Sequence, residues 1–225
     1  MENIFDEALR SGRNLYEDEA WRLFKKYDIP TPRCRLAETA DDAAAAAKEI
    51  GYPVVLKIVS DILHKSDMGG VKVGIQSEAS LREAFSNIME SVKHNKPDAG
   101  IKGMLVCEML RPGVEIIIGM NQDISFGPTM MFGLGGIFVE VFNDVSFRVL
   151  PLDRKNAKDM IEETKGVALL RGLRGEKPKD INAIVELLLK VAKLIGDNPQ
   201  IRELDINPCF VYESGVIPAD AKVIL

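Results

Sequence analysis

The sequence has few cysteines, no excess of basic residues and no long apolar run, and each shortage excludes a class of protein. The 3 cysteines, at positions 34, 107 and 209, form no C-x-x-C pair, so we expect buried thiols in a reducing cytoplasm. The net charge of −5, without a long basic run, argues against nucleic acid as the main partner. Residues 1–13 do not resemble a signal peptide and no apolar run has the length of a membrane span, so we expect a cytoplasmic protein with no membrane partner.

Two common nucleotide-binding motifs are missing as well. No G-x-x-x-x-G-K-[ST] sequence occurs, which excludes a P-loop. The glycine-rich stretch 133–136 resembles the start of a dinucleotide-binding fingerprint. However, Phe138 stands where that fingerprint needs its third glycine, and a strand-like stretch, 138–142, follows in place of a helix. We therefore interpret these glycines as a tight bend.

The sequence does contain enough apolar material for a core, since 46% of its residues are hydrophobic and 28% are charged. Its length fits one large domain or two small lobes. Helical spacing alternates with groups of short apolar runs, which favours an α+β fold with mixed or antiparallel sheets over a doubly wound parallel sheet. Helices are expected at 4–9, 16–27, 40–50 (with Thr39 as N-cap and Gly51 as its end), 81–92, 153–170 with an interruption, and 180–196; strands are expected at 34–37, 54–59, 71–75, 104–109, 114–120, 128–132, 138–142, 147–150, 201–212 and 216–224.

The stretch 54–74 carries the strongest chemical signal. Two apolar runs flank a loop that is rich in ionisable groups and ends in the pair Gly69-Gly70. Lys57 can supply a mobile positive charge for phosphate, and consecutive glycines let backbone N–H groups approach an anion. His64 could accept or relay a phosphoryl group, because an imidazole is largely neutral and nucleophilic at neutral pH. This composition predicts a phosphate site with a nucleophile in it.

The C-terminal hairpin is a candidate metal site. Side chains alternate along a strand, so Asp205 and Asn207 share one face. With a two-residue turn at 214–215, Asp220 faces Cys209 and lies diagonal to Asn207 on that same face. Carboxylate and carboxamide oxygens suit Mg²⁺. The alternatives are a solvated acidic face, or a register shifted by one residue, which would turn Asp220 away.

Three further residues could meet a nucleotide. Glu108 and Glu115 flank the turn at 111–113, which would form a hinge between two halves of the chain, and carboxylates in such a crevice could bind ribose or an adenine amino group. Exposed carboxylates beside a turn are an equally good explanation. Arg148 could meet a phosphate or could be an ordinary ion-paired arginine.

Three motifs resemble one family. KIVSDILHKSDMGGVKVG (57–74), GVEIIIGMNQDISFGPTMMFGLGGIFVEVFNDVSFRVLPL (113–152) and ELDINP…ADAK (203–222) are similar to the β subunit of ADP-forming acetyl-CoA synthetase, the ATP-grasp part of the nucleoside-diphosphate-forming acyl-CoA synthetases. These enzymes are relatives of succinyl-CoA synthetase. The resemblance extends from about Tyr16 to Val223.

The resemblance implies an ATP-grasp fold in which two α+β lobes, 1–110 and 111–225, grip a nucleotide. It implies the reversible reaction acetyl-CoA + ADP + phosphate ⇌ acetate + ATP + CoA, with Mg²⁺. It also implies a CoA-binding α subunit that carries its own phosphohistidine, in an α2β2 heterotetramer. The implied roles are a second phosphohistidine for His64; the nucleotide phosphates for Lys57, Gly69, Gly70 and Arg148; adenine for Glu108, Met109 and Leu110; ribose for Glu115; and Mg²⁺ for Asn207 and Asp220, supported by Asp205.

Two other functions remain open from the sequence. A stand-alone ATP-grasp ligase would activate a carboxylate as an acyl phosphate and would not need His64. A non-catalytic nucleotide-sensing ATP-grasp module would bind nucleotide without phosphoryl transfer.

Overall fold

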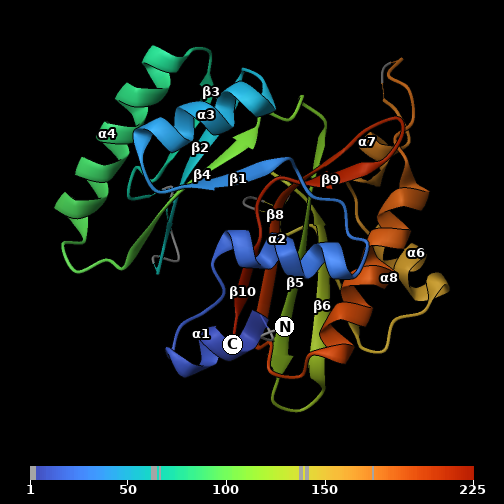
Figure 1. The fold of residues 1–225 in the computed structure, drawn as a ribbon. Coiled ribbons are helices and arrows are strands. Elements are labelled where there is room, and N and C mark those ends of the chain that lie inside the picture. The colour runs from blue at the N-terminus through green and yellow to red at the C-terminus, as the bar shows by residue number, and fades with distance from the viewer. Residues whose placement is uncertain (1–3, 62–64, 66, 137–138, 140–141, 174) are drawn as a thin grey trace. The chain divides into compact units, whose positions relative to one another are not determined.

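The computed structural model describes residues 4–61, 65, 67–136, 139, 142–173 and 175–225. The chain forms two compact units, shown as a ribbon in Figure 1. Unit 1 comprises Met1–Leu15, Ala20–Thr31 and Pro112–Leu225, and unit 2 comprises Tyr16–Glu19 and Pro32–Arg111. The expected boundary at 110/111 is one residue from the boundary at 111/112, but two N-terminal segments belong to the unit that contains the C-terminal half.

Unit 2 is built on a four-stranded antiparallel sheet with the strand order β1-β4-β2-β3. Its two helices pack on the sheet (Figure 1). Apolar side chains from both helices fill the core. Strand β2 has a hydrogen-bonded neighbour on each side, and every residue from Val54 to Val59 is buried. The elements are β1 (Cys34–Ala37), α3 (Ala40–Ile50), β2 (Val54–Ser60), β3 (Val71–Ile75), α4 (Glu78–Asn95) and β4 (Ile101–Glu108).

The ends of α3 illustrate how the sequence sets local structure. Thr39 and Asp42 form a capping box, in which Asp42 N–H donates to Thr39 Oγ1 over 3.1 Å and Thr39 N–H donates to Asp42 Oδ2 over 3.2 Å. Gly51 ends the helix at φ +92°, where its N–H donates to the Ala47 carbonyl. Both predicted helix ends are confirmed.

Unit 1 contains a six-stranded sheet with the order β10-β8-β5-β6-β7, and β9 also pairs with β8. Helices α6 and α8 pack against each other and α6 contacts β6 and β7, so these helices cover one face of the sheet. The elements are α1 (Ile4–Arg10), β5 (Val114–Asp123), β6 (Gly127–Leu134), β7 (Val145–Val149), α6 (Arg154–Glu162), α7 (Val167–Leu170), α8 (Ile181–Asp197), β8 (Glu203–Val211), β9 (Val216–Pro218) and β10 (Lys222–Ile224); α2 (Glu17–Lys26) begins in unit 2 and ends in unit 1.

All strand pairs in the described part of the chain are antiparallel, which confirms the predicted α+β class. The strand predicted at 138–142 is wrong at Val139, which is helical and whose carbonyl accepts a hydrogen bond from Asn143 N–H; much of the rest lies outside the described residues. Apolar residues near a glycine bend misled the prediction, because short apolar runs do not distinguish a strand from a helical turn. None of the helices in the described part is long and apolar enough to cross a membrane.

The cysteines are only partly as expected. Cys107 and Cys209 are buried, but Cys34 is half-buried. Cys34 and Cys107, which are far apart in the sequence, stand directly opposite each other on β1 and β4. All three thiols are free.

Candidate functional site

Lys57 lies on the central strand β2 of unit 2, where only 6% of the residue is exposed. A buried ammonium needs a compensating partner, because removing an unpaired charge from water is costly. That partner is Glu17, whose Oε1 lies 2.7 Å from Lys57 Nζ. Lys57 is therefore held in place as a cation on a rigid strand.

Glu17 was not predicted as a site residue. It lies at the start of α2 and is itself 7% exposed, and its second oxygen, Oε2, accepts a hydrogen bond from Lys65 Nζ. The available signal was the acidic run 17–19, but acidic residues in the first turn of a helix are common because they complement the helix dipole. The pairing itself joins residues 40 and 48 positions apart, which the sequence does not reveal.

The pair Gly69-Gly70 has a packing role within the loop of unit 2. A Cβ on Gly70 would lie 2.6 Å from Ile58 Cγ2 and 2.7 Å from the Lys65 carbonyl oxygen, so a larger residue does not fit. Gly70 N–H donates to the Lys65 carbonyl, and its own carbonyl accepts from Ile58 N–H, both over 2.7 Å. These bonds fix the loop against β2. The predicted phosphate contact of both glycines stays a prediction, and His64 lies outside the described residues.

Glu108 ends strand β4 and is held by Arg33. Its two carboxylate oxygens accept hydrogen bonds from the Arg33 backbone N–H and from Arg33 Nε, over 2.8 and 2.9 Å. Met109 follows it with 40% of its surface exposed, and its N–H donates to the Pro53 carbonyl. Leu110 is half-buried. The structure thus groups the three residues predicted for adenine at one edge of unit 2, and their role remains a prediction.

Glu115 is exposed on β5 in unit 1, opposite Phe210 on β8. Its carbonyl accepts a hydrogen bond from Gly135 N–H over 2.7 Å, and a Cβ on Gly135 would lie 2.8 Å from Glu115 Cβ. The predicted bend at 133–136 is thus only partly right, because Gly133 and Leu134 still belong to β6 and the chain leaves the strand at Gly135 and Gly136. The ribose contact predicted for exposed Glu115 stays a prediction.

Arg148 on β7 is ion-paired with Glu163. Arg148 Nη1 lies 3.0 Å from Glu163 Oε2, and Nη2 bonds Oε1, which gives a two-point pair. The hydrogen bond from Arg148 is the main reason that the pKa of Glu163 lies below its ordinary value. The ion-paired alternative considered from the sequence is thus present, and a phosphate contact would have to compete with Glu163.

The C-terminal hairpin brings Asn207, Asp220 and Asp205 together, with a different register from the predicted one. Tyr212 N–H donates to the Gly215 carbonyl, so the turn residues are 213–214 and not 214–215. Pro218, not Asp220, is therefore opposite Cys209.

The corrected register still keeps Asp220 on the predicted face, because the shift is by two residues. Strands β9 and β10 pair with β8 in one continuous register, which sets Asp220 level with Asn207. Leu204 and Ile206 are buried while Asn207 is exposed, as the alternation predicted. Cys209, predicted on the face of Asn207, is buried instead, because the register between β5 and β8 shifts between Ile206 and Cys209. Burial raises the pKa of Asp205, Lys222 opposes this shift, and the charges of Asp220 and Glu203 add to it.

These oxygen donors suit Mg²⁺. Clustered carboxylates, one of them with a raised pKa, favour a cation, and oxygen ligands without sulfur or imidazole are typical of Mg²⁺. No group of three His, Cys, Asp or Glu residues within the described ranges forms a metal site, so any site here needs Asn207 and ligand oxygens as well.

Asp205 also borders a groove of about 630 Å³ on the same sheet face. One cross-strand row, from β7 to β10, runs beneath it: Phe147, Met131, Gly119, Asp205 and Lys222. Because Gly119 has no side chain, Glu203 and Asp205 share one hollow surface with half-buried Met131 of β6 and exposed Phe147 of β7.

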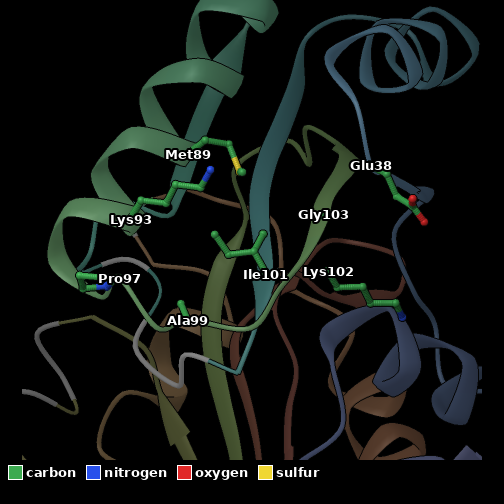
Figure 2. Close-up of a pocket in the computed structure, with 8 residues that line it drawn as sticks. All are labelled: Glu38, Met89, Lys93, Pro97, Ala99, Ile101, Lys102 and Gly103. Carbon is green, nitrogen blue, oxygen red and sulfur yellow. The ribbon is translucent and has the colours of Figure 1, made fainter.

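A second pocket, of about 430 Å³, lies in unit 2 beside α4 and β4 (Figure 2). It contains none of the predicted site residues. Figure 2 shows Lys93 on α4 and Lys102 on β4 at separate parts of its wall. Lys102 points towards α2, where its Nζ lies 3.0 Å from Asp18 Oδ2.

Comparison with known proteins agrees with this architecture. The model of the ATP-grasp domain family matches residues 7–225. The chain is 48% identical over 223 residues to the β subunit of acetate–CoA ligase [ADP-forming] I of Pyrococcus furiosus, a match that covers 99% of this chain and 96% of the relative.

Solved structures give the same result. Acetyl-coenzyme A synthetase 1 of Candidatus Korarchaeum cryptofilum, in complex with coenzyme A and Ca-AMPCP, has a TM-score of 0.94 and 49% identity, covering 97% of this chain and 96% of that one. A further structure of that enzyme, with Mg-AMPPCP and a phosphohistidine segment pointing towards the nucleotide site, has a TM-score of 0.85 and 44% identity, covering 99% and 98%. The chain belongs to the ATP-grasp family and, within it, to the β subunits of the ADP-forming acetate–CoA ligases.

Proposed function

We propose that this chain is the nucleotide-binding subunit of an ADP-forming acetate–CoA ligase, which interconverts acetyl-CoA, ADP and phosphate with acetate, ATP and CoA. The observation that carries the proposal is the extent of the match to the Pyrococcus furiosus subunit, which includes nearly the full length of both chains. The buried lysine on β2 and the clustered oxygens of the C-terminal hairpin support it, because phosphoryl transfer depends on positioning and on neutralising charge.

Each proposed site residue has its own role in binding the nucleotide and Mg²⁺. Lys57 binds nucleotide phosphates, with Gly69 and Gly70 in the loop over them, and Arg148 leaves Glu163 to offset charge on the transferred group. Glu108, Met109 and Leu110 bind adenine, and Glu115 binds ribose. Asn207, Asp220 and Asp205 hold Mg²⁺, which when bound neutralises phosphate charge.

His64 is the proposed relay, argued from its place in the loop sequence. The phosphoryl group passes from a phosphohistidine of the partner subunit to an imidazole nitrogen of His64. A β-phosphate oxygen of ADP then forms the new P–O bond as the N–P bond to His64 breaks. Two short transfers thus replace one long one.

The proposal includes a partner. A relative named as a β subunit supports an α chain, which in our proposal binds CoA, carries the first phosphohistidine and forms an α2β2 heterotetramer with this chain in the cytoplasm. This chain alone should form no thioester, because the proposed CoA site belongs to the α chain.

The test is co-expression with the α chain encoded by the same organism. The purified complex should form ATP from acetyl-CoA, ADP and phosphate, and label from ³²P-phosphate should appear on both subunits as acid-labile phosphohistidine. The variant His64→Asn should retain labelling of the α chain and lose ATP formation. ATP formation by this chain alone, or full activity of His64→Asn, would contradict the proposal.

A further inference from the structure

The first turn of α2 connects to two lysines through one carboxylate. Lys57 Nζ bonds Oε1 of Glu17 and Lys65 Nζ bonds Oε2, so each lysine takes a different oxygen. The side chains of Glu17, Lys57 and Lys65 are 5%, 8% and 15% exposed. Three ionised groups therefore meet in a largely dry place within unit 2.

We propose that Glu17 is a positioning residue for phosphoryl transfer, whose carboxylate holds Lys57 and Lys65 side by side and releases them to the oxygens of the transferred group. This inference rests on the proposed function, because it gives the lysine pair the transferred phosphoryl group as its ligand.

The geometry of the two contacts supports this role. A carboxylate presents two anionic oxygens, and two ammonium groups that each bind one of them are already arranged to bind two oxygens of a single anion. A phosphoryl group offers oxygens of the same kind. Lysine is a compact charge on a flexible stem, so without a fixed partner the two ammonium groups would sample many positions.

The two lysines come from different parts of unit 2, so their relative position depends on a contact that joins those parts. Lys57 is on the central strand β2, and Lys65 is in the loop and follows His64 directly in the sequence. Glu17 thus ties the loop to the strand at the position next to the proposed relay. Misplacement of a charge by about 1 Å can lower a rate about 100-fold, so this tie bears on kcat.

The alternative is that Glu17 only compensates a buried lysine. Helix α2 provides a matched control for it, because the next residue, Asp18, also binds a lysine. Lys102 Nζ lies 3.2 and 3.0 Å from the two oxygens of Asp18. Asp18→Asn removes a carboxylate from the same helical turn and leaves the Glu17 contacts in place.

The experiment compares wild type, Glu17→Gln, Glu17→Asp and Asp18→Asn, each in complex with the α chain. For Glu17→Gln we expect kcat for ATP formation to fall about 10- to 100-fold per folded complex, while the KM for ADP stays within about threefold. Glu17→Asp is one methylene too short to reach both lysines, so its kcat should also fall. Because it keeps the negative charge, the fall should be smaller than that of Glu17→Gln. It also serves if Glu17→Gln does not fold. Asp18→Asn should match wild type.

A second measurement needs no activity. Acetic anhydride should acetylate Lys65 several-fold faster in Glu17→Gln than in Asp18→Asn, as peptide mass spectrometry would show. Equal labelling, or a Glu17→Gln complex whose kcat per folded enzyme equals that of Asp18→Asn, would overturn the inference and leave the proposed function intact. A wild-type complex that forms no ATP would overturn both.

Discussion

Asp220 stands level with Asn207 because the strands on either side of it, β9 and β10, pair with β8 in one register. The chain leaves the sheet only between Pro218 and Lys222, and Ala219 N–H still donates to the Pro208 carbonyl over 2.9 Å. The register thus sets a carboxylate opposite a carboxamide, and neither is in the core, since Asn207 is exposed and Asp220 is half-buried.

This pairing predicts a specific loss of cation binding. Asp220→Ala should weaken Mg²⁺·ADP binding by at least about 10-fold, since it removes one of few oxygen donors. Isothermal titration calorimetry on the purified complex would measure it. Glu213→Gln, in the turn of the same hairpin, is the control and should bind like wild type. Equal affinities for both variants would exclude Asp220 from the metal site.

The raised pKa of Asp205 predicts a pH-dependent stability change. Because the folded state binds this proton more tightly than the unfolded state does, ionised Asp205 destabilises the fold above its raised pKa, and the cost disappears as the pH falls to the ordinary value. Without divalent cations, Asp205→Asn should therefore have a higher Tm than wild type at pH 7, and the difference should shrink as the pH falls towards 4. Calorimetry over this range would measure it.

The control for Asp205 is Asp197, whose pKa is shifted in the opposite direction. A hydrogen bond from Lys193 lowers the pKa of Asp197, so its ionised form stabilises the fold above its ordinary pKa, and this benefit is lost as the pH falls through the lowered value. Asp197→Asn should slightly lower the Tm at pH 7. If both variants shifted the Tm in the same direction, our account of Asp205 would be wrong.

Arg148 allows stability and activity to be separated. Arg148→Ala removes a partly exposed ion pair and should change the free energy of unfolding by about 1 kcal/mol or less. If Arg148 meets the transferred phosphoryl group, kcat should fall by about 100-fold. Glu163→Gln frees the guanidinium and should keep most of the activity. Steady-state kinetics would measure kcat and urea unfolding would measure stability. Equal losses of kcat in both variants would mean that Arg148 acts only through its ion pair with Glu163.

Gly70 should not tolerate a side chain. Gly70→Ala places a methyl group 2.6 Å from Ile58 Cγ2 and should destabilise the fold by about 2 kcal/mol. Gly196→Ala in α8 meets nothing within 4 Å and should stabilise it by about 0.5 kcal/mol. Chemical denaturation would measure both, and equal stability of the two variants would contradict the packing described for the loop.

The thiols should differ in reactivity. Burial raises the pKa of the Cys107 and Cys209 thiols, so little thiolate is present on either at pH 8. Half-buried Cys34 should react first with iodoacetamide in the native protein, and all 3 cysteines should react in denaturant. Fast labelling should be absent from Cys34→Ser. Early modification of Cys107, detected by mass spectrometry, would contradict this.

Local chemistry made much of the fold predictable. Capping by Thr39, termination at Gly51 and the apolar spacing of α8 depend on residues within a few positions of one another, and each prediction is confirmed. The turn of the closing hairpin was misplaced by one residue because Gly215, with φ +83°, follows the turn pair instead of belonging to it.

The partners of the site residues were not predictable in the same way. Lys57 was recognised as a candidate from its neighbours, but its bond to Glu17 depends on how α2 and β2 pack, and a single sequence carries no record of that distance. The same holds for Arg148 and Glu163, which are 15 positions apart on different elements. Strand register and long-range contacts depend on packing. The sequence therefore predicted which residue types could serve a site, but it did not predict their contact partners.

The order of the two units along the chain has a consequence for protein engineering. Unit 2 includes four residues, Tyr16–Glu19, that lie within an N-terminal stretch otherwise belonging to unit 1. A fragment starting at Pro32 would keep both lysines and discard the acid that joins them. A design that excises, swaps or permutes unit 2 must therefore keep residues 16–19 together with residues 32–111.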